Sequence, residues 1–250
     1  MRILVCYKYV RDENEISVNP DRTLNTDAAS WVISPYDVNA VEAAMKLAEA
    51  AGESTVEVLT VGGEAVENSK MRKAILSRGP AKMYAVKCDA CGDMYATASL
   101  LAQAIEKLGG VDLIICGDGS GDMYSQTMGN LLAGILGIPA VNNVNALSYE
   151  NGSVIAARSC GSDTELLEVS GCAVVSVTSD ICRARIPSMK DILSAGKKPV
   201  EQWSAADMQQ CPPQTELLSM LAPEKAQRSS IMYKGDDALE RFAAELAKHI

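Results

Sequence analysis

The sequence predicts an α/β fold: a Rossmann-like, mostly parallel sheet with helices on both faces, an antiparallel β addition and an extended C-terminal arm. Over roughly the first 140 residues, short apolar runs alternate with helical patterns, as is typical of a parallel sheet. A glycine-rich loop follows one of these runs and leads into a helical pattern. Beyond Pro139 the chain changes to paired extended runs, and then to a polar segment dotted with prolines.

The parallel part begins with apolar runs that are typical of strands covered on both faces. These runs lie at residues 2–6, 56–61, 83–86 and 113–116. Between the first two, residues 15–18 and 22–25 could pair as a small hairpin. In the strand–helix alternation the loops after Cys6, Val61 and Cys116 open on one edge of the sheet, where such folds bind ligands.

Helices are expected between these strands. Ser34, Pro35 and Asp37 are typical of the N-cap, N1 and N3 positions of a helix that ends near Gly52. A helix of roughly four turns should follow Gly62-Gly63 and end at Ser77. Apolar residues at helical spacing, which would form one buried stripe, predict two further helices, over 98–108 and from Met128 to Leu136.

The second half predicts strands, an arm and a final helix. Residues 144–149 and 153–158 flank Asn151-Gly152, the signature of a type I′ hairpin. Residues 165–169 and 173–178 continue this antiparallel addition, whereas 179–198 show no clear periodicity before Ile192. Residues 202–228 are polar and dotted with prolines, which predicts an extended arm. The spacing of Leu239, Phe242 and Leu246 predicts a final amphipathic helix. We therefore expect a nucleotide-binding domain over 1–200 and, over 201–250, an arm and helix that pack on a partner subunit.

Composition narrows the function classes. The chain is 48% hydrophobic but only 4% aromatic, so its core should consist of aliphatic side chains and methionine. A net charge of −9 without a basic block argues against a nucleic-acid partner. No stretch approaches the ~20 apolar residues of a membrane span, and the first residues lead directly into a strand without a signal pattern. We expect a cytoplasmic protein with no membrane insertion.

The eight cysteines do not form a metal or disulfide pattern. Cys6, Cys116 and Cys172 lie in or beside apolar runs, where a free thiol behaves as a small hydrophobic group. Cys88 and Cys91 form a single C-x-x-C without a second pair, and His249 is the only histidine. We therefore expect reduced thiols and no metal.

The candidate site lies between Val111 and Asn130. Glycines at 117, 119 and 121 follow the apolar strand, and their missing side chains let a ligand approach the backbone. The helix that follows would present free N–H groups and its positive dipole end to a phosphate. Further donors come from the side chains of Ser125, Gln126 and Thr127. This arrangement predicts a nucleotide phosphate site.

An ordinary glycine-rich connection between a strand and a helix explains the same residues equally well. The G-x-G-x-G spacing is neither the G-x-G-x-x-G dinucleotide fingerprint nor a P-loop. Asp118 and Asp122 also place two carboxylates near the phosphate, unless they face ribose or solvent. From these residues alone, both readings stay open.

Four motifs in the right order, spread over about the first 200 residues, are more specific than any one of them. They are residues 2–8, 34–37 before 42–44, 111–129, and 185–190 with 195–199. On these motifs the chain resembles the beta subunit of electron transfer flavoprotein. It is most similar to the FixA-like branch, in which Gly117–Ser120 and Trp203–Asp207 recur.

The resemblance implies a heterodimer with an alpha subunit that holds the redox FAD. The beta subunit of family members binds AMP, and in bifurcating members a second FAD takes that place. Carried over by position, the pocket residues are Cys6, Ser34, Pro35, Tyr36, Asp37, Gly62, Gly117, Asp118, Gly119, Ser120, Gly121, Asp122, Met123, Tyr124, Ser125, Gln126 and Thr127. The loop from Gly117 to Tyr124 is shorter and richer in glycine than in AMP-binding members, which leaves the ligand open.

The family implies an electron carrier between an acyl-CoA dehydrogenase and a further acceptor, in which the cofactor performs the redox chemistry. The sequence shows no catalytic triad, metal cluster or paired acid and base, in agreement with a carrier. Two alternatives remain: a bifurcating form that takes electrons from NADH, and an ATP-using enzyme or nucleotide sensor with the same core.

The segment Arg185–Lys190 is the expected contact with the dehydrogenase. In family members the position of Met189 carries a leucine that enters an apolar pocket on an acyl-CoA dehydrogenase, and methionine is an adaptable substitute. Pro187 stiffens the segment without supplying a helix, and Arg185 and Lys190 would meet an acidic rim. The alternative is that Met189 packs inward as part of the core.

Overall fold

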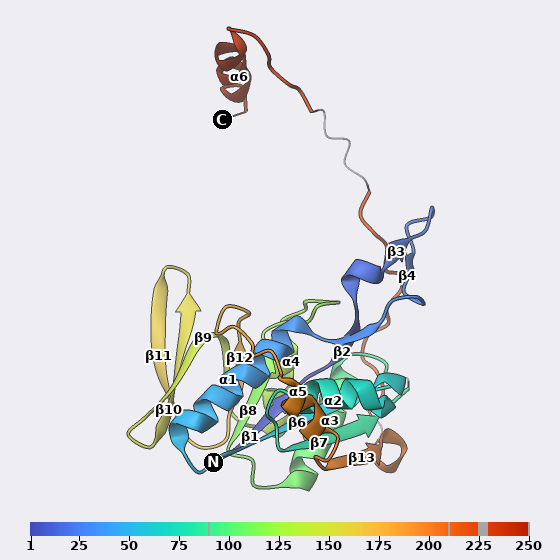
Figure 1. Ribbon diagram of the computed structural model, residues 1–250, viewed down its shortest axis with the longest axis vertical. Coiled ribbons are helices and arrows are strands. Elements are labelled where there is room, and N and C mark those ends of the chain that lie inside the picture. The colour runs from blue at the N-terminus through green and yellow to red at the C-terminus, as the bar shows by residue number, and fades with distance from the viewer. Residues whose placement is uncertain (90, 210, 225–229, 250) are drawn as a thin grey trace. The chain divides into compact units, whose positions relative to one another are not determined.

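The computed structural model describes residues 1–89, 91–209, 211–224 and 230–249 (Figure 1). It divides into a main unit, Met1–Ser17 with Asn25–Ser219, and a smaller unit, Val18–Leu24 with Met220–Ile250. The two units are described separately. Among the described residues, no helix has the length and apolar character needed to cross a membrane.

A large mixed sheet forms the centre of the main unit. In the described part of the chain it has nine strands, and its middle and one edge are parallel. In spatial order the strands are β11 (Asp163–Val169), β10 (Ser153–Cys160), β9 (Ala140–Glu150), β12 (Val174–Val177), β8 (Leu113–Gly117), β1 (Arg2–Cys6), β6 (Thr55–Gly62), β7 (Lys82–Lys87) and β13 (Val200–Ser204). The predicted α/β class is confirmed.

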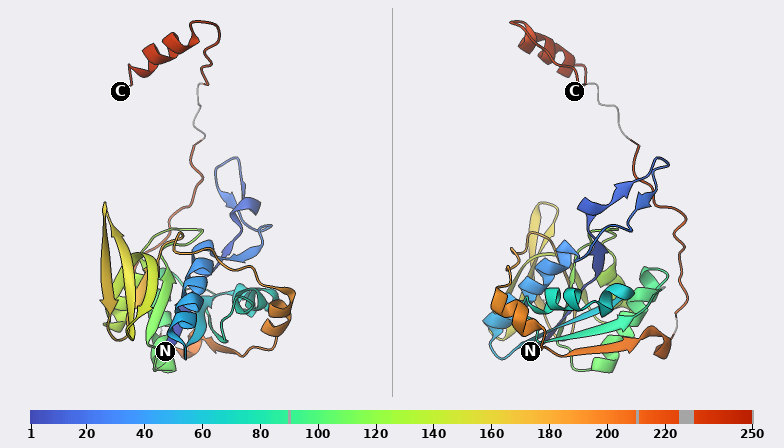
Figure 2. Two further views of the ribbon diagram at one scale, coloured as in Figure 1. Left: turned by 60° about the vertical axis from the view of Figure 1, so that its left-hand side comes forward. Right: turned by 45° about the vertical axis from the view of Figure 1, so that its right-hand side comes forward.

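Helices cover both faces of this sheet (Figure 2). Helices α1 (Pro35–Ala51) and α2 (Ser69–Leu76) contribute to one buried cluster, which includes Ile3 and Val5 of β1. Helices α3 (Met94–Leu108) and α4 (Met128–Leu136) contribute to the other, with Leu4. Adjacent residues of β1 thus enter opposite clusters, as the alternation of side chains along a strand requires. This explains the unbroken apolar runs of the sequence.

The chain reverses its winding direction at β1. Strands β6 and β7 lie successively on one side of β1, and α3 then leads to β8 on the other side. The carboxyl ends of β1 and β8 therefore border a topological switch point, where open α/β sheets bind ligands.

The segment after β6 differs from the predicted single helix of four turns. It forms a short 3-10 helix, Glu64–Glu67, before α2 begins at Ser69. The reason is Asn68, whose backbone is extended and whose side chain accepts hydrogen bonds from the N–H groups of Lys70 and Met71. Asn68 is thus both the C-cap of the 3-10 helix and the N-cap of α2.

The antiparallel addition is β9, β10 and β11. Positive φ angles of 52° at Asn151 and 89° at Gly152 agree with the predicted type I′ turn. The expectation that residues 173–178 belong to this addition is wrong. That strand, β12, pairs in parallel with both β8 and β9, because the loop after β11 carries the chain back into the middle of the sheet.

Two elements lie where no regular structure was expected. Helix α5 (Met189–Ala195) begins at a capping box, in which Ser188 and Asp191 exchange side-chain and backbone hydrogen bonds. Strand β13 then pairs with β7, followed by a 3-10 helix at Ala205–Asp207. The main unit therefore extends beyond residue 200, the predicted domain boundary.

A second small sheet joins β2 (Tyr9–Arg11) to β5 (Trp31–Ile33), and a 3-10 helix covers Glu13–Glu15. The predicted hairpin near residues 15–25 is present as β3 (Ser17–Val18) and β4 (Leu24–Asn25). Helix α6 (Ala238–Leu246) matches the predicted final helix. Residues 210, 225–229 and 250 of the predicted arm lie outside the described residues.

Candidate functional site

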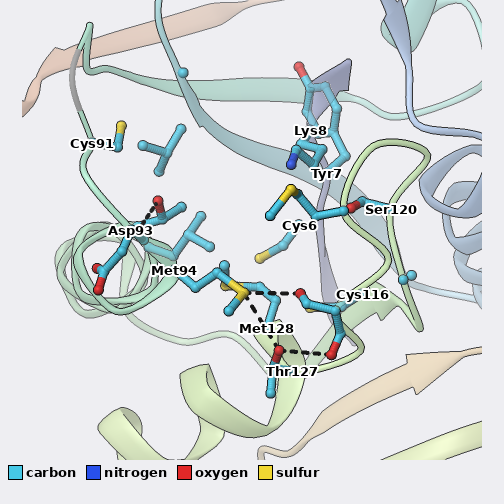
Figure 3. A pocket seen from close by; sticks show the side chains of 18 of the residues that line it. Cys6, Tyr7, Lys8, Cys91, Asp93, Met94, Cys116, Ser120, Thr127 and Met128 are labelled. Carbon is cyan, nitrogen blue, oxygen red and sulfur yellow. Dashed lines mark hydrogen bonds between the residues drawn. The ribbon is translucent and has the colours of Figure 1, made fainter. Parts of the chain in front are cut away.

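A cavity of about 540 Å³ opens at the carboxyl ends of β1, β6, β7 and β8 (Figure 3). Cys6 to Tyr9 contribute to it from the end of β1 to the start of β2, Val61 to Gly63 from the end of β6, and Cys88 from the residue after β7. The loop after β8 and the start of α3 complete the main walls. Its volume is within the range of small-molecule and cofactor pockets, about 300–1,000 Å³.

Most residues predicted for the site line this cavity. They are Cys6, Asp37, Gly62, Gly117, Asp118, Gly119, Ser120, Met123, Ser125, Gln126 and Thr127. Six predicted residues do not line it: Ser34, Pro35, Tyr36, Gly121, Asp122 and Tyr124. Two of them, Pro35 and Gly121, line a separate pocket beside β2 and β5. The ring of Tyr36 packs on that of Tyr124 with centroids 5.0 Å apart.

The glycines of the loop make room for the protein's own side chains. A Cβ at Gly117 would lie 2.6 Å from the Asp37 carboxylate, and one at Gly119 would overlap the ring of Tyr124. A Cβ at Gly121 would come within 3.2 Å of Pro35. Packing within the loop and against the start of α1 therefore requires these glycines, whatever a ligand adds.

Polar contacts hold the loop in a constrained shape. Tyr124 and Gln126 have positive φ angles of 44° and 55°, which non-glycine residues adopt rarely. Gln126 donates from Nε2 to Asp118 at 2.6 Å, and Lys8 forms an ion pair with Asp122 at 2.7 Å. Such strain persists only where surrounding contacts enforce it, and it is concentrated at binding sites.

These contacts also explain the two loop carboxylates. Burial raises the pKa of Asp122, but hydrogen bonds from Lys8 and Ser120 outweigh it and leave the pKa below its ordinary value. The charge of Asp122 is therefore matched by Lys8, and Asp118 accepts from Gln126. Lys8 thus compensates the charge of Asp122, whereas the Gln126 amide is neutral and adds no positive charge beside Asp118.

The start of α4 offers backbone donors to the cavity. Thr127 is the N-cap residue, but its side chain forms no capping bond, so it leaves the first-turn N–H groups of the helix without that partner. The Thr127 hydroxyl instead donates to the carbonyl of Ser125 at 3.0 Å, and the Ser125 hydroxyl donates to Sδ of Met94 at 3.0 Å. An uncapped helix start is a ready anion site.

Asp37 lies beneath the loop and joins three elements. It is 6% exposed, at the start of α1, and one of its oxygens accepts from the backbone N–H of Lys8 at 2.8 Å. The N–H of Gly117 also donates to it. Burial raises the pKa of Asp37 to about 7, against the lowering effect of these two hydrogen bonds.

Sulfur atoms form much of the apolar lining (Figure 3). Cys6 and Cys116 are neighbours across β1 and β8, and their hydrogen bond, together with burial, holds the pKa of Cys116 well above its ordinary value. Burial is also the main cause that raises the pKa of Cys91 to about 12. Cys116 and Cys91 are therefore neutral thiols that act as hydrophobic groups. In the described part of the chain, no three cysteine, histidine or acidic side chains are placed to hold a metal ion.

Sequence reasoning missed several lining residues. Tyr7, Lys8, Gly63 and Cys88 follow directly from strands that were predicted, so their position at the strand ends was a usable signal. Asp93, Met94 and Thr97 belong to the start of α3, which the sequence placed too late. Thr215, Glu216 and Leu217 carried no signal, because the polar segment around them has no period that places it on the sheet.

The segment expected to bind a dehydrogenase presents an apolar surface. Met189 is 72% exposed at the first position of α5, so the alternative of a core methionine is wrong. Leu193 is equally exposed, and Ile186 is exposed as well. We call Ile186, Met189, Ile192 and Leu193 the α5 surface.

Arg185 anchors this segment within the chain. Its guanidinium contacts the buried Glu42 of α1 at 2.6 Å and Glu49 at 3.0 Å. The hydrogen bond to Glu42 is the main cause of a raised pKa of Arg185. Pro187 is partly buried beside it, and Lys190 is exposed. Arg185 therefore positions the α5 surface.

The fold and this site define a Rossmann-like α/β protein with a cavity at its switch point. The electron transfer flavoprotein domain family model matches residues 21–208, and the chain belongs to this family. Members are electron carriers rather than enzymes in the ordinary sense, and they are associated with flavin.

The raised pKa of Asp37 predicts a characteristic dependence of stability on pH. An aspartate titrates near 3.8 when unfolded and this one at about 7 when folded. Between these values the folded state binds more protons, so the free energy of unfolding should fall as pH rises from about 4 to about 7. The Asp37→Asn variant has no titrating group at this position. Its side chain has one acceptor oxygen instead of two, so the variant should be less stable than the wild type across this pH range. The stability difference between wild type and variant should therefore shrink by ~1 kcal/mol or more across this window.

Urea denaturation at several pH values measures this difference. Asp191→Asn is the control, because hydrogen bonds from Ser188 lower the pKa of Asp191 and the difference should then grow as pH rises. Parallel profiles for wild type and Asp37→Asn would contradict the assignment.

Proposed function

We propose that this chain is the beta subunit of a heterodimeric electron transfer flavoprotein of the FixA-like branch, with a nucleotide in the cavity described above. The main support for this proposal is that the cavity lining agrees with the residues expected from the family resemblance. The cavity at the switch point is lined by most of the residues between Gly117 and Thr127 that the family resemblance assigns to nucleotide binding. Family membership in general implies an alpha subunit and a dehydrogenase partner.

The residues present fit a nucleotide. The uncapped start of α4 supplies N–H groups for a phosphate, in a loop where Lys8 compensates the charge of Asp122 and Gln126 donates a hydrogen bond to Asp118. Neutral thiols and methionines supply an apolar wall for an aromatic base. This division into a few polar donors and a mostly apolar lining is typical of cofactor sites.

The ligand is AMP or a second FAD. FAD in the alpha subunit would supply the redox chemistry, and this chain's residues bind, orient and shield the nucleotide. With AMP, the protein is a simple shuttle between an acyl-CoA dehydrogenase and a further acceptor, whereas a second FAD favours a bifurcating carrier that takes electrons from NADH. An ATP-using enzyme or nucleotide sensor is the third possibility.

We propose two docking surfaces for the two protein partners. The C-terminal region from residue 201, with α6, would pack on the alpha subunit. The α5 surface would enter an apolar pocket on the dehydrogenase, through Met189 with Lys190 beside it. Arg185 supports this contact from within, since its ion pairs with Glu42 and Glu49 hold the segment on α1. We expect the complex in the cytoplasm.

Co-expression with an alpha subunit and mass analysis of the released ligands test the proposal. We expect a yellow heterodimer that contains FAD and either AMP or a second FAD. A nucleotide-free heterodimer would contradict the nucleotide site, and a stable, stoichiometrically flavinated monomer would contradict the subunit assignment. ATP turnover by the chain alone would favour the third possibility.

Thr127→Val should weaken nucleotide binding about tenfold or more. The variant loses the hydroxyl that we propose donates to a phosphate oxygen at the helix start, and a hydrogen bond to a charged group is worth about 1.5–3 kcal/mol. Titration calorimetry with AMP and with FAD measures the effect. Thr178→Val is the matched control, because its hydroxyl also donates to a backbone carbonyl, that of Val144, but it does not line the cavity. Equal losses in both variants would count against a role for Thr127.

Met189→Ala should slow electron transfer with an acyl-CoA dehydrogenase and leave the melting temperature nearly unchanged. Substitution of an exposed side chain usually changes stability by no more than about 0.5 kcal/mol. Leu166→Ala on β11 is the control, since both side chains are 72% exposed. Stopped-flow reduction of the heterodimer's flavin gives the rate. A melting temperature several degrees lower, or an unchanged rate, would refute this anchor.

A further inference from the structure

A segment from the end of the main unit forms part of the cavity wall. Thr215, Glu216 and Leu217 all line the cavity, although they lie about 90 residues beyond the loop that follows β8. We call residues 213–217 the strap. Its side chains are exposed rather than buried in a core, so packing alone does not hold it.

Asp93 holds the strap through one of its two carboxylate oxygens. Oδ2 accepts three hydrogen bonds, from the N–H groups of Gln214 (2.7 Å) and Thr215 (2.8 Å) and from the Thr215 hydroxyl (3.0 Å). The other oxygen, Oδ1, caps α3 by accepting from the N–H of Ala96 at 2.9 Å. One side chain therefore both starts α3 and fastens the strap to it.

The neighbouring glycine completes the attachment. Gly92 has a φ of +78°, and a Cβ at this position would lie 2.9 Å from the ring of Pro213. The strap thus packs on Gly92, which immediately precedes Asp93. Hydrogen bonds to Asp93 lower its pKa, which keeps the carboxylate charged at neutral pH, with the bond from Ala96 the largest cause.

The position of the attachment connects the strap to the ligand. Asp93 and Met94 also line the cavity, and the hydroxyl of Ser125 donates to Met94. The start of α3 therefore lies between the loop after β8 and the strap. Two carboxylates, those of Asp93 and Glu216, lie on the strap side of the cavity, which disfavours a phosphate there and favours the uncharged base or ribose.

We propose that the strap is a wall of the nucleotide site, held in place by Asp93 against the base or ribose of the ligand, so that nucleotide retention depends on this contact. The inference rests on the proposed nucleotide site and adds residues that neither the loop motif nor the family resemblance assigns. Asp93 is a positioning residue here, and Thr215, Glu216 and Leu217 are the contact residues.

Asp93→Ser separates the two roles of Asp93. Serine is a good N-cap, so α3 keeps its start, but it has no second oxygen to accept from the strap. We expect the affinity of the full-length chain for AMP and for FAD, measured by calorimetry, to fall about tenfold or more, because a charged acceptor of three donors is lost. Asn68→Ser, the same kind of change at the cap of α2 outside the cavity, should leave both affinities unchanged.

Cleavage after Glu216 by a glutamyl endopeptidase gives a second readout. We expect saturating AMP or FAD to protect this bond in the wild type, and Asp93→Ser to be cut faster with little protection. Wild-type affinity and protection in Asp93→Ser would overturn the strap while leaving the nucleotide site intact. A wild-type chain that binds neither probe would overturn the nucleotide site, and the strap with it.

Discussion

The hydrogen bonds of the Asp37 carboxylate are the contact on which the site depends. They join the first turn of α1 to the backbone of Lys8 after β1 and of Gly117 after β8. These strands are the two that border the switch point, so one buried side chain sets the distance between the loops that flank the cavity. Its elevated pKa is the energetic consequence of placing a carboxyl group where packing excludes water.

Other parts of the site follow the same arrangement, in which a polar side chain joins loops that the sheet brings together. Lys8 and Asp122 connect the β1 loop to the β8 loop, and Asp93 connects α3 to the strap. On another part of the molecule, the ion pair of Arg185 with Glu42 connects the segment before α5 to α1. Glu42 lies on α1 and Asp93 is the N-cap of α3, so in these two cases a helix provides the position to which the other segment is attached.

The central strands, the helix start at Ser34–Asp37 and the hairpin at Asn151-Gly152 were predictable, because each depends on residues close together in the sequence. Much of the cavity was predictable for the same reason, since its lining follows the ends of predicted strands. The break at Asn68 was missed because capping overrode the helical pattern, and α5 was missed because a helix this short has little periodicity. The parallel pairing of β12 was missed because the chain returns to the middle of the sheet after β11, and no local sequence pattern indicates this path.

The sequence by itself determined the α/β class, the glycine-rich loop with the helix behind it, and membership of a family of electron carriers. These properties are local or cumulative, because they follow from the spacing of apolar residues, from the turn residues and from the order of the motifs. Only the tertiary structure decided why the glycines are needed, which carboxylates are compensated, and that Thr215–Leu217 share a cavity with Cys6. Most of those facts depend on contacts between residues far apart in the sequence, such as Lys8 with Asp122 and Asp93 with Thr215, and such pairs become neighbours only once the sheet is assembled.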